Sequence, residues 1–201
     1  MPIITPEEIG TLIPALKGNL GTRVSKLLFS ILSMNKLNDA YDEAADHTGE
    51  DFAQKFLEHR GIDYQIGNSE RLFHLPEGPF ITISNHPYGH LDGVMLIDMF
   101  GHFRHDYKVM VNTILGLIKA LEPNFITVIP TGKERTAPKA ESISGIKATI
   151  GHIREGGAVG IFPSGAVSDL SLKDKCVRDR QWQEAAIKLT QIQAASATAG
   201  R

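Results

Sequence analysis

Short apolar runs alternate with helical patterns from residue 80 onward, and this alternation most limits the folds open to the chain. Strand-like runs are expected over 80–84, 108–112, 125–130 and 158–162, and helical runs over 94–100, 114–121, 142–154 and 182–193. Parallel strands need long crossover connections, which helices usually provide. The pattern therefore predicts an α/β fold with a mostly parallel central sheet flanked by helices.

The first part of the chain follows a different pattern, which predicts a helical N-terminal extension. No acidic residue occurs between Thr11 and Asn38, whereas four basic residues do. Apolar residues recur there at helical spacing, at Val24, Leu27, Leu28, Ile31 and Leu32. Such a basic amphipathic helix can lie on anionic lipid headgroups, or it can pack on the core with solvated lysines. The periodicity is the same for both interpretations.

An acidic stretch over residues 39–51 follows, and we interpret it as a solvated face. A second helix is expected over residues 51–59, because Gly61 provides a stop just beyond it. We divide the chain into three parts: an N-terminal helical segment over residues 1–62, an α/β domain over 63–193 and a disordered tail over 194–201. The N-terminal segment is the part expected to touch a membrane surface.

Charge and cysteine content exclude several classes of protein. The formal net charge is −2, so the whole chain has no electrostatic attraction for nucleic acid. The single cysteine, Cys176, excludes an internal disulfide framework and a cysteine-rich zinc site. The first residues lack the pattern of a secretory signal, and no apolar run approaches the ~18 residues of a membrane-spanning helix. We therefore expect a protein that is neither exported nor membrane-spanning.

The densest group of chemically capable residues is SNHPYGHLDG at 84–93, between an expected strand and an expected helix. Proteins of the α/β class place their sites at such junctions. Asp92 near a helix start is favoured as an anion. Its carboxylate can orient the imidazole of His86 and stabilise the imidazolium. The pair fits a general base that activates a substrate alcohol or amine, with no protein nucleophile beside it.

Other interpretations of this segment compete with the general base. A histidine in a turn is often only a satisfied polar residue. His86, His90 and Asp92 are also possible metal ligands, but their spacing fits the HxHxDH pattern of metallo-hydrolases poorly. No further histidine or cysteine cluster completes a coordination shell. We expect no metal and no bound cofactor.

The segment resembles the histidine–aspartate motif of the glycerol-phosphate and lysophosphatidic acid acyltransferase superfamily. It is most similar to the hemolysin-type subgroup, which is associated with ornithine and glycine lipids. A second block, IFPSGAVS at 161–168, lies where the family has FPEGTRS. FITVIPTGK at 125–133 lies where the family has its acceptor-binding block, and residues 35–62 and RDRQW at 178–182 are also similar. The resemblance covers about residues 26–188.

The resemblance implies direct acyl transfer from an acyl carrier protein or coenzyme A thioester to a lyso-lipid hydroxyl or amine. His86 would deprotonate the acceptor, and Asp92 would orient His86. The substrate-binding residues expected beside this pair are Asn85, Gly89, Gly93, Lys133, Phe162, Pro163, Ser164 and Gly165. Turn geometry alone would also explain the asparagine and the glycines, and 162–165 also fits an ordinary strand-to-helix turn. A cytoplasmic, peripheral location at the inner face of the cell membrane is implied.

Departures from the family pattern refine these expectations. Five residues separate His86 from Asp92, where four are commoner. Ser164 replaces the family's glutamate, and Val167 replaces an arginine expected to hold an acceptor phosphate. An aminolipid acceptor is therefore favoured. The ending AASATAGR, where the family continues into another strand, suggests a truncated or divergent member. A catalytically impaired lipid-binding protein and a His/Asp ester or thioester hydrolase are the alternative functions.

Overall fold

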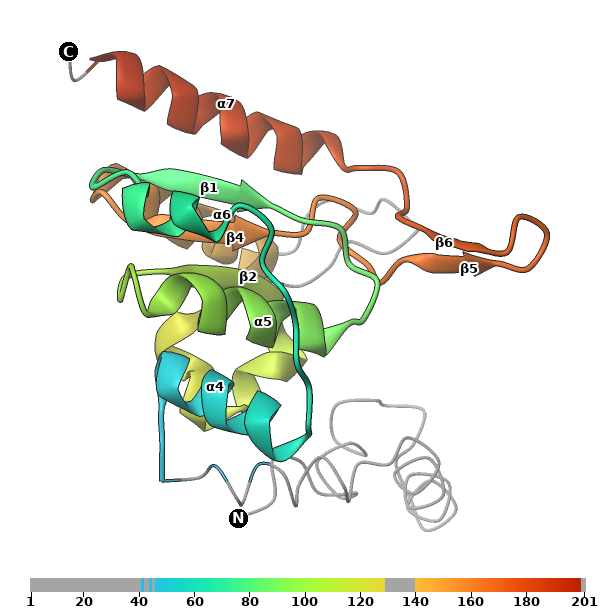
Figure 1. The fold of residues 1–201 in the computed structure, drawn as a ribbon. Helices are drawn as coiled ribbons and strands as arrows, with labels where there is room; N and C mark the ends of the chain where they lie inside the picture. Colours follow the sequence, from blue (N-terminus) through green and yellow to red (C-terminus); the bar gives the residue numbers. More distant parts are fainter. Residues whose placement is uncertain (1–40, 42–43, 45, 129–139, 200–201) are drawn as a thin grey trace, which may run out of the picture.

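A computed structural model describes residues 41, 44, 46–128 and 140–199 and places a four-stranded sheet at the centre (Figure 1). The α-helices are α4 (Gly49–His59), α5 (His90–Gly101), α6 (Ala140–Arg154) and α7 (Glu184–Ala199). The strands are β1 (Phe80–Ile83), β2 (Lys108–Asn112), β3 (Phe125–Val128), β4 (Ala158–Ile161), β5 (Asp169–Ser171) and β6 (Cys176–Arg178). Short 3₁₀ helices are η2 (Ser69–His74), η3 (Thr113–Leu117) and η4 (Lys119–Asn124).

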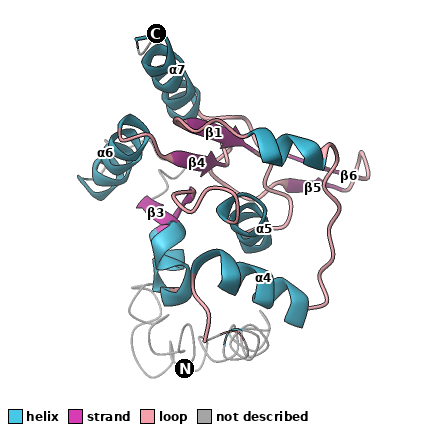
Figure 2. Ribbon diagram, turned by 60° about the vertical axis from the view of Figure 1, so that its left-hand side comes forward, coloured by secondary structure: helices cyan, strands magenta, loops and turns pink. Residues whose placement is uncertain are grey.

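The central sheet has the order β1-β4-β2-β3, and all three strand pairs are parallel. The chain passes from β1 through α5 to β2, and it returns from β3 through α6 to β4. Figure 2 shows α4 and α5 on one face of the sheet and α6 and α7 on the other. The predicted α/β class with a parallel sheet is therefore confirmed. β5 and β6 form a separate antiparallel hairpin.

Two apolar clusters fill the space between the sheet and its helices. Phe52, Ile97 and Val109 belong to the larger cluster, beneath α4 and α5. The smaller cluster lies on the α6 face and comprises Ile126, Ile153, Val159 and Ile161, all buried. Every residue of β4 is buried, as expected for an inner strand covered on both faces. This rigid layer supports the loops at the ends of β1 and β4.

Several elements differ from the sequence-based expectation. The helix expected over 94–100 begins at His90, because Gly89 turns the chain with a φ of +66°. The region 114–121 forms η3 and η4 instead of one helical run. The tail predicted as disordered from residue 194 is helical in α7 as far as Ala199, and its alanines favour a helix. The hairpin of β5 and β6 was not foreseen.

The predicted N-terminal amphipathic helix lies outside the described residues. α4 is described, and it packs against α5 and η4. The division of the chain at residue 62 stays a prediction.

Candidate active site

The two sequence blocks meet because β1 and β4 are neighbouring parallel strands. Their register pairs Ile83 with Ile161, at the carboxyl end of each strand. The N–H of Ser84 continues this pairing and donates to the carbonyl of Ile161 at 3.2 Å. Segments 84–89 and 162–168 therefore leave the same edge of the sheet side by side, which is where open α/β sheets bind ligands.

His86 and Asp92 form a hydrogen-bonded pair at this edge. His86 Nδ1 lies 3.0 Å from Asp92 Oδ2, and the two side chains are only 18% and 10% exposed. Asp92 Oδ2 also accepts the backbone N–H of Tyr88 at 2.9 Å. A carboxylate can only accept, so Nδ1 carries the proton in this contact and Nε2 is left to take one. The arrangement is that of a base oriented by a carboxylate.

The loop between these two residues accommodates the unusual spacing. Gly89 has a φ of +66°, which an L side chain rarely adopts, and α5 begins directly after it. The N–H of Asp92 donates to the carbonyl of Gly89 at 3.1 Å, so Asp92 lies in the first turn of α5. The helix N-terminus there favours a negative side chain. Five intervening residues are thus compatible with direct contact of the pair.

The second block holds His86 from the other side. The ring of Phe162 stacks on the imidazole, with centroids 4.1 Å apart and 22° between the planes. The N–H of Ser168 donates to the carbonyl of His86 at 2.8 Å. Phe162 therefore fixes the plane of the ring, and Ser168 fixes the backbone that carries it.

The rest of the second block is built into a tight turn. The N–H of Gly165 donates to the carbonyl of Phe162 at 2.9 Å, and Gly165 has a φ of +66°. The N–H of Gln183 donates to the carbonyl of Pro163 at 2.9 Å. Ser164 is buried, and its Oγ donates to the carbonyl of Ala166 at 2.8 Å. These contacts form a tight turn that leads from β4 to β5, so the expected strand-to-helix turn is wrong. Within 162–165, Phe162 is the residue seen to stack on His86.

Asp179, directly after β6, is a residue that sequence reasoning missed, although it lies in RDRQW. Its carboxylate accepts Trp182 Nε1–H and Ser168 Oγ–H, both at 2.9 Å. Hydrogen bonding with the side chain of Ser164 and with the backbone of His86 also lowers the pKa of this carboxyl. Desolvation raises the pKa of Asp179, but these hydrogen bonds outweigh it and hold the pKa below its ordinary value. A carboxylate therefore lies beside Ser164, where the family's glutamate is absent.

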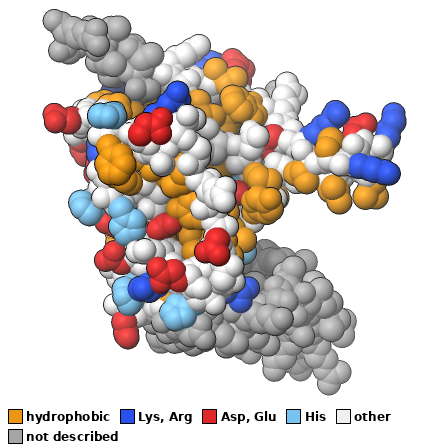
Figure 3. Space-filling model, in the orientation of Figure 1, with side chains coloured by type: hydrophobic (Ala, Val, Ile, Leu, Met, Phe, Trp, Pro, Cys, Tyr) orange, Lys and Arg blue, Asp and Glu red, His pale blue; other side chains and the backbone are white. Residues whose placement is uncertain are grey.

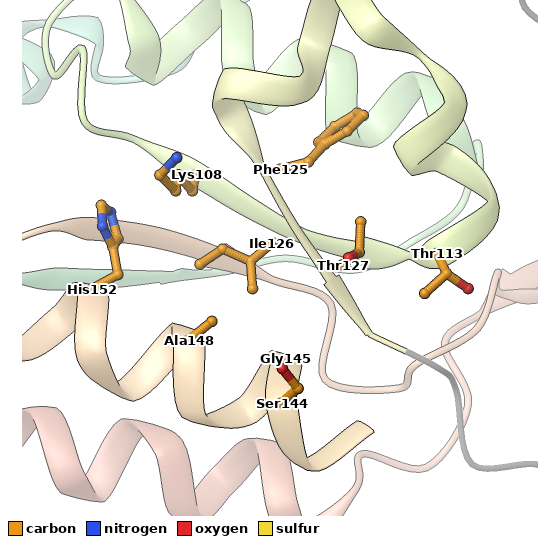
Figure 4. A pocket seen from close by; sticks show the side chains of 9 residues that line it. All are labelled: Lys108, Thr113, Phe125, Ile126, Thr127, Ser144, Gly145, Ala148 and His152. Carbon is orange, nitrogen blue, oxygen red and sulfur yellow. The ribbon is translucent and has the colours of Figure 1, made fainter. Parts of the chain in front are cut away.

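A pocket of about 540 Å³ lies between β3 and α6, as Figure 4 shows. Its lining comprises Lys108, Thr113, Phe125, Ile126, Thr127, Ser144, Gly145, Ala148 and His152. β4 and β2 separate β3 from β1 in the sheet. The pocket therefore lies beside the outer strand β3, on the far side of the sheet from β1 and His86, and is not part of this site.

The residues that the structure describes contain neither a metal-binding cluster nor a membrane-spanning helix. Among them, no group of three or more histidine, cysteine, aspartate or glutamate side chains is placed to hold a metal ion. Within the same residues, no helix has the length and apolar character needed to span a bilayer.

Comparison with known proteins decides the family. Residues 14–190 match a family described as acyltransferases, and this range includes both blocks and Asp179. The chain belongs to the acyltransferase family. The resemblance inferred from the sequence is therefore confirmed.

Two relatives of this chain have a more specific description. A lyso-glycine lipid O-acyltransferase of Bacteroides thetaiotaomicron is 28% identical over 163 residues, which are 80% of this chain and 56% of that protein. A lyso-glycine lipid O-acyltransferase of Phocaeicola vulgatus is 31% identical over 119 residues, 58% of this chain and 42% of that protein. The chain thus spans about half the length of these relatives, and the likeness to an aminolipid subgroup is confirmed.

The structure places the expected site residues of the chain in different surroundings. His86, Asp92, Gly89 and Phe162 come together, as described above. Asn85 is exposed next to His86. Gly93 is buried in α5, and the position of its missing Cβ faces open space. Lys133 lies outside the described residues.

Proposed function

We propose that this chain transfers a fatty acyl group from an acyl thioester to the hydroxyl of a lyso-glycine lipid, with His86 as general base. The observation that carries the proposal is the 3.0 Å contact between His86 Nδ1 and Asp92 Oδ2 at the carboxyl edge of the sheet. Family membership and the descriptions of the two relatives support the reaction class and the acceptor.

The proposed reaction needs only one proton carrier. His86 Nε2 takes the proton of the acceptor hydroxyl while the oxygen attacks the thioester carbonyl carbon. Asp92 stabilises the resulting imidazolium through Nδ1. The tetrahedral intermediate then collapses, the C–S bond breaks, and the imidazolium returns the proton to the leaving thiolate. The products are an ester and a free thiol, and no acyl-enzyme forms.

The surroundings of the pair are suited to an uncharged reacting group. Phe162 covers one face of the imidazole and keeps water from it. Val167, where the family has an arginine, is 44% exposed. A valine supplies no bidentate contact for a phosphate, which favours an aminolipid acceptor. Asn85, Gly89, Gly93 and Lys133 remain proposed acceptor-binding residues, as do Pro163, Ser164 and Gly165.

The donor and the location follow from the same proposal. We assign the donor to an acyl carrier protein or coenzyme A thioester, because direct transfer needs a thiol leaving group. The acceptor is a membrane lipid, so the reaction takes place at the bilayer surface, on the inner face of the cell membrane where these thioesters are found.

The test uses the full chain with acyl carrier protein and coenzyme A thioesters and with lyso-glycine lipid or lysophosphatidic acid. Mass spectrometry measures the diacyl product. We expect His86→Ala to lower turnover about 100- to 10,000-fold and Asp92→Asn about 100-fold or more. His102→Ala is a matched control, because His102 Nε2 lies 3.4 Å from Asp98 Oδ1 at the opposite end of α5. It is expected to keep wild-type turnover.

Each outcome separates the proposal from its alternatives. Product from lysophosphatidic acid and not from lyso-glycine lipid would overturn the acceptor. Free fatty acid without diacyl product, lost in His86→Ala, would favour a hydrolase. Lipid binding without any product, unchanged in His86→Ala, would favour a catalytically impaired lipid-binding member.

A further inference from the structure

The hairpin formed by β5 and β6 projects from the body of the molecule (Figure 1). Cross-strand register pairs Leu170 with Val177, so these two side chains share one face of the hairpin. Leu172 follows two residues after Leu170, in the turn. Leu170, Leu172 and Val177 are 64%, 82% and 53% exposed. We call these three residues the hairpin face.

Exposed apolar side chains are concentrated in this part of the molecule. Among the described residues, eleven large hydrophobic side chains are exposed, and five of them lie between residues 167 and 182. In Figure 3 hydrophobic side chains gather along one side of the projecting hairpin and basic ones at its outer end. Contiguous apolar patches mark interaction sites, and an isolated two-stranded hairpin is only marginally stable in water. A partner that covers the hairpin face would remove its apolar side chains from water and would stabilise the two strands.

The charges of the hairpin favour an anionic partner. Residues 169–178 contain three basic and two acidic side chains, whereas the whole chain carries a net charge of −2. Both carboxylates are engaged within this region. Asp169 pairs with Arg180 at 2.7 Å, and Asp174 accepts Ser171 Oγ–H at 3.0 Å and lies 3.4 Å from Arg178. Lys173 and Lys175 are exposed in the turn, where they can bind an anion of a partner.

The hairpin is attached directly to the loop that carries His86. Ser168, one residue before β5, donates its N–H to the carbonyl of His86 at 2.8 Å. Asp179, one residue after β6, accepts Ser168 Oγ–H at 2.9 Å, and hydrogen bonding with the backbone of His86 contributes to its lowered pKa. Tyr88 and Trp182 flank this attachment and are 67% and 43% exposed. Amphipathic aromatic rings of this kind are favoured at a membrane–water interface.

We propose that the hairpin face inserts into the interfacial region of an anionic lipid bilayer, with Lys173 and Lys175 on the headgroups. Apolar side chains beside basic ones are the combination that such an interface binds. Because both ends of the hairpin hold the His86 loop, docking there brings the base to the lipid surface. This consequence rests on the proposed function, whereas the docking itself does not.

The test measures binding of the full chain to vesicles of phosphatidylcholine alone and of phosphatidylcholine with phosphatidylglycerol, by flotation. We expect tighter binding to the anionic vesicles. The double variant Leu170→Ser/Leu172→Ser should weaken binding to both about tenfold or more, because two buried leucines are lost. The variant Lys173→Gln/Lys175→Gln should weaken binding to anionic vesicles alone, about fivefold for each lysine.

Controls come from elements outside the hairpin. Phe73, 74% exposed in η2 before β1, and Lys119, exposed in η4 before β3, carry the same types of side chain away from residues 167–182. Phe73→Ser and Lys119→Gln are expected to bind vesicles like the wild type. His86→Ala should bind fully but form diacyl lipid about 100- to 10,000-fold more slowly, which separates docking from catalysis.

Three results would overturn the proposal. The first is equal vesicle binding by the wild type and the leucine variant. The second is equal loss of binding in the Phe73→Ser control. The third is a dimer in lipid-free solution that the leucine variant converts to a monomer, because a second copy of the chain would then cover the hairpin face.

Discussion

The imidazole of His86 is held by residues that are far from it in the sequence. Phe162 stacks on its ring, Ser168 binds its backbone carbonyl, and Asp179 in turn binds Ser168. Only Asp92 belongs to the same segment. The geometry of the base therefore depends on groups that do not themselves take the proton, and substitutions there should change the rate more than the binding of substrate.

Asp179→Asn tests this dependence most directly. Asparagine keeps the shape but loses the charge and part of the capacity to accept hydrogen bonds. We expect kcat to fall about tenfold with KM nearly unchanged, because the His86 loop is less well fixed. Steady-state kinetics with the thioester as varied substrate measure both. Asp174→Asn, in the same hairpin, is the control and should leave kcat unchanged.

The pKa of Asp179 adds a pH dependence to this prediction. Its pKa lies below the ordinary value of 3.8, so the folded state favours the carboxylate. The stabilisation is complete above the ordinary pKa and is lost as the pH falls through the lower pKa of the folded state. Thermal unfolding of the wild type should therefore lose stability more steeply below about pH 4 than that of Asp179→Asn. Parallel curves, or a wild-type kcat in the variant, would contradict the assignment.

Sequence reasoning reached the residues that share one segment and missed those that the fold brings in. His86, Asp92 and Gly89 are spaced for a turn into a helix, and their chemistry could be interpreted without coordinates. Asp179 lies 87 residues beyond Asp92, and only the path of the hairpin places its carboxylate beside His86. Gly93 lies within α5, so turn geometry, the other explanation for this glycine, does not apply to it.

Among the elements, β4 contributes most to the position of the site. It lies between β1 and β2, and its carboxyl end carries Phe162. The alternation of apolar runs predicted parallel strands but not their order, because an apolar run does not indicate which other run is its neighbour in the sheet. The hairpin escaped prediction because its strands have only three residues each, with side chains that are mostly exposed.

Gly160→Ala tests the packing of this strand. A Cβ at this position would collide with the hydroxyl of Tyr107, which is fully buried and lies 2.5 Å from Thr82 Oγ1. We expect the free energy of unfolding to fall by about 2–3 kcal/mol, because the buried ring has little room to move. Chemical denaturation measures it.

A second glycine provides the control for that substitution. Gly151 lies within α6, and a Cβ there would meet nothing within 4 Å. Gly151→Ala should raise the free energy of unfolding by about 0.5–1 kcal/mol, because alanine favours a helix. If both variants lost stability equally, the contact between Gly160 and Tyr107 would not be the cause.

Across the whole molecule, burial is very unequal. Every residue of β4 is buried, whereas most residues of β5 and β6 are exposed. Local stability follows buried apolar contact, so the two regions should open with different free energies. In lipid-free solution, amide hydrogens of Val159–Ile161 should exchange only through global unfolding. Those of residues 169–178 should exchange within roughly tenfold of an unstructured chain.

The same hydrogen-exchange measurement, repeated with anionic vesicles, tests the proposed docking. If the hairpin face enters the bilayer, the amides of residues 169–178 should become protected while those of β4 keep the same rates. The variant Leu170→Ser/Leu172→Ser should show no such protection. Strong protection of the hairpin amides without lipid would mean that another part of the protein or a second copy already covers the hairpin. Protection spread evenly over the chain would indicate general stabilisation instead of contact at one surface.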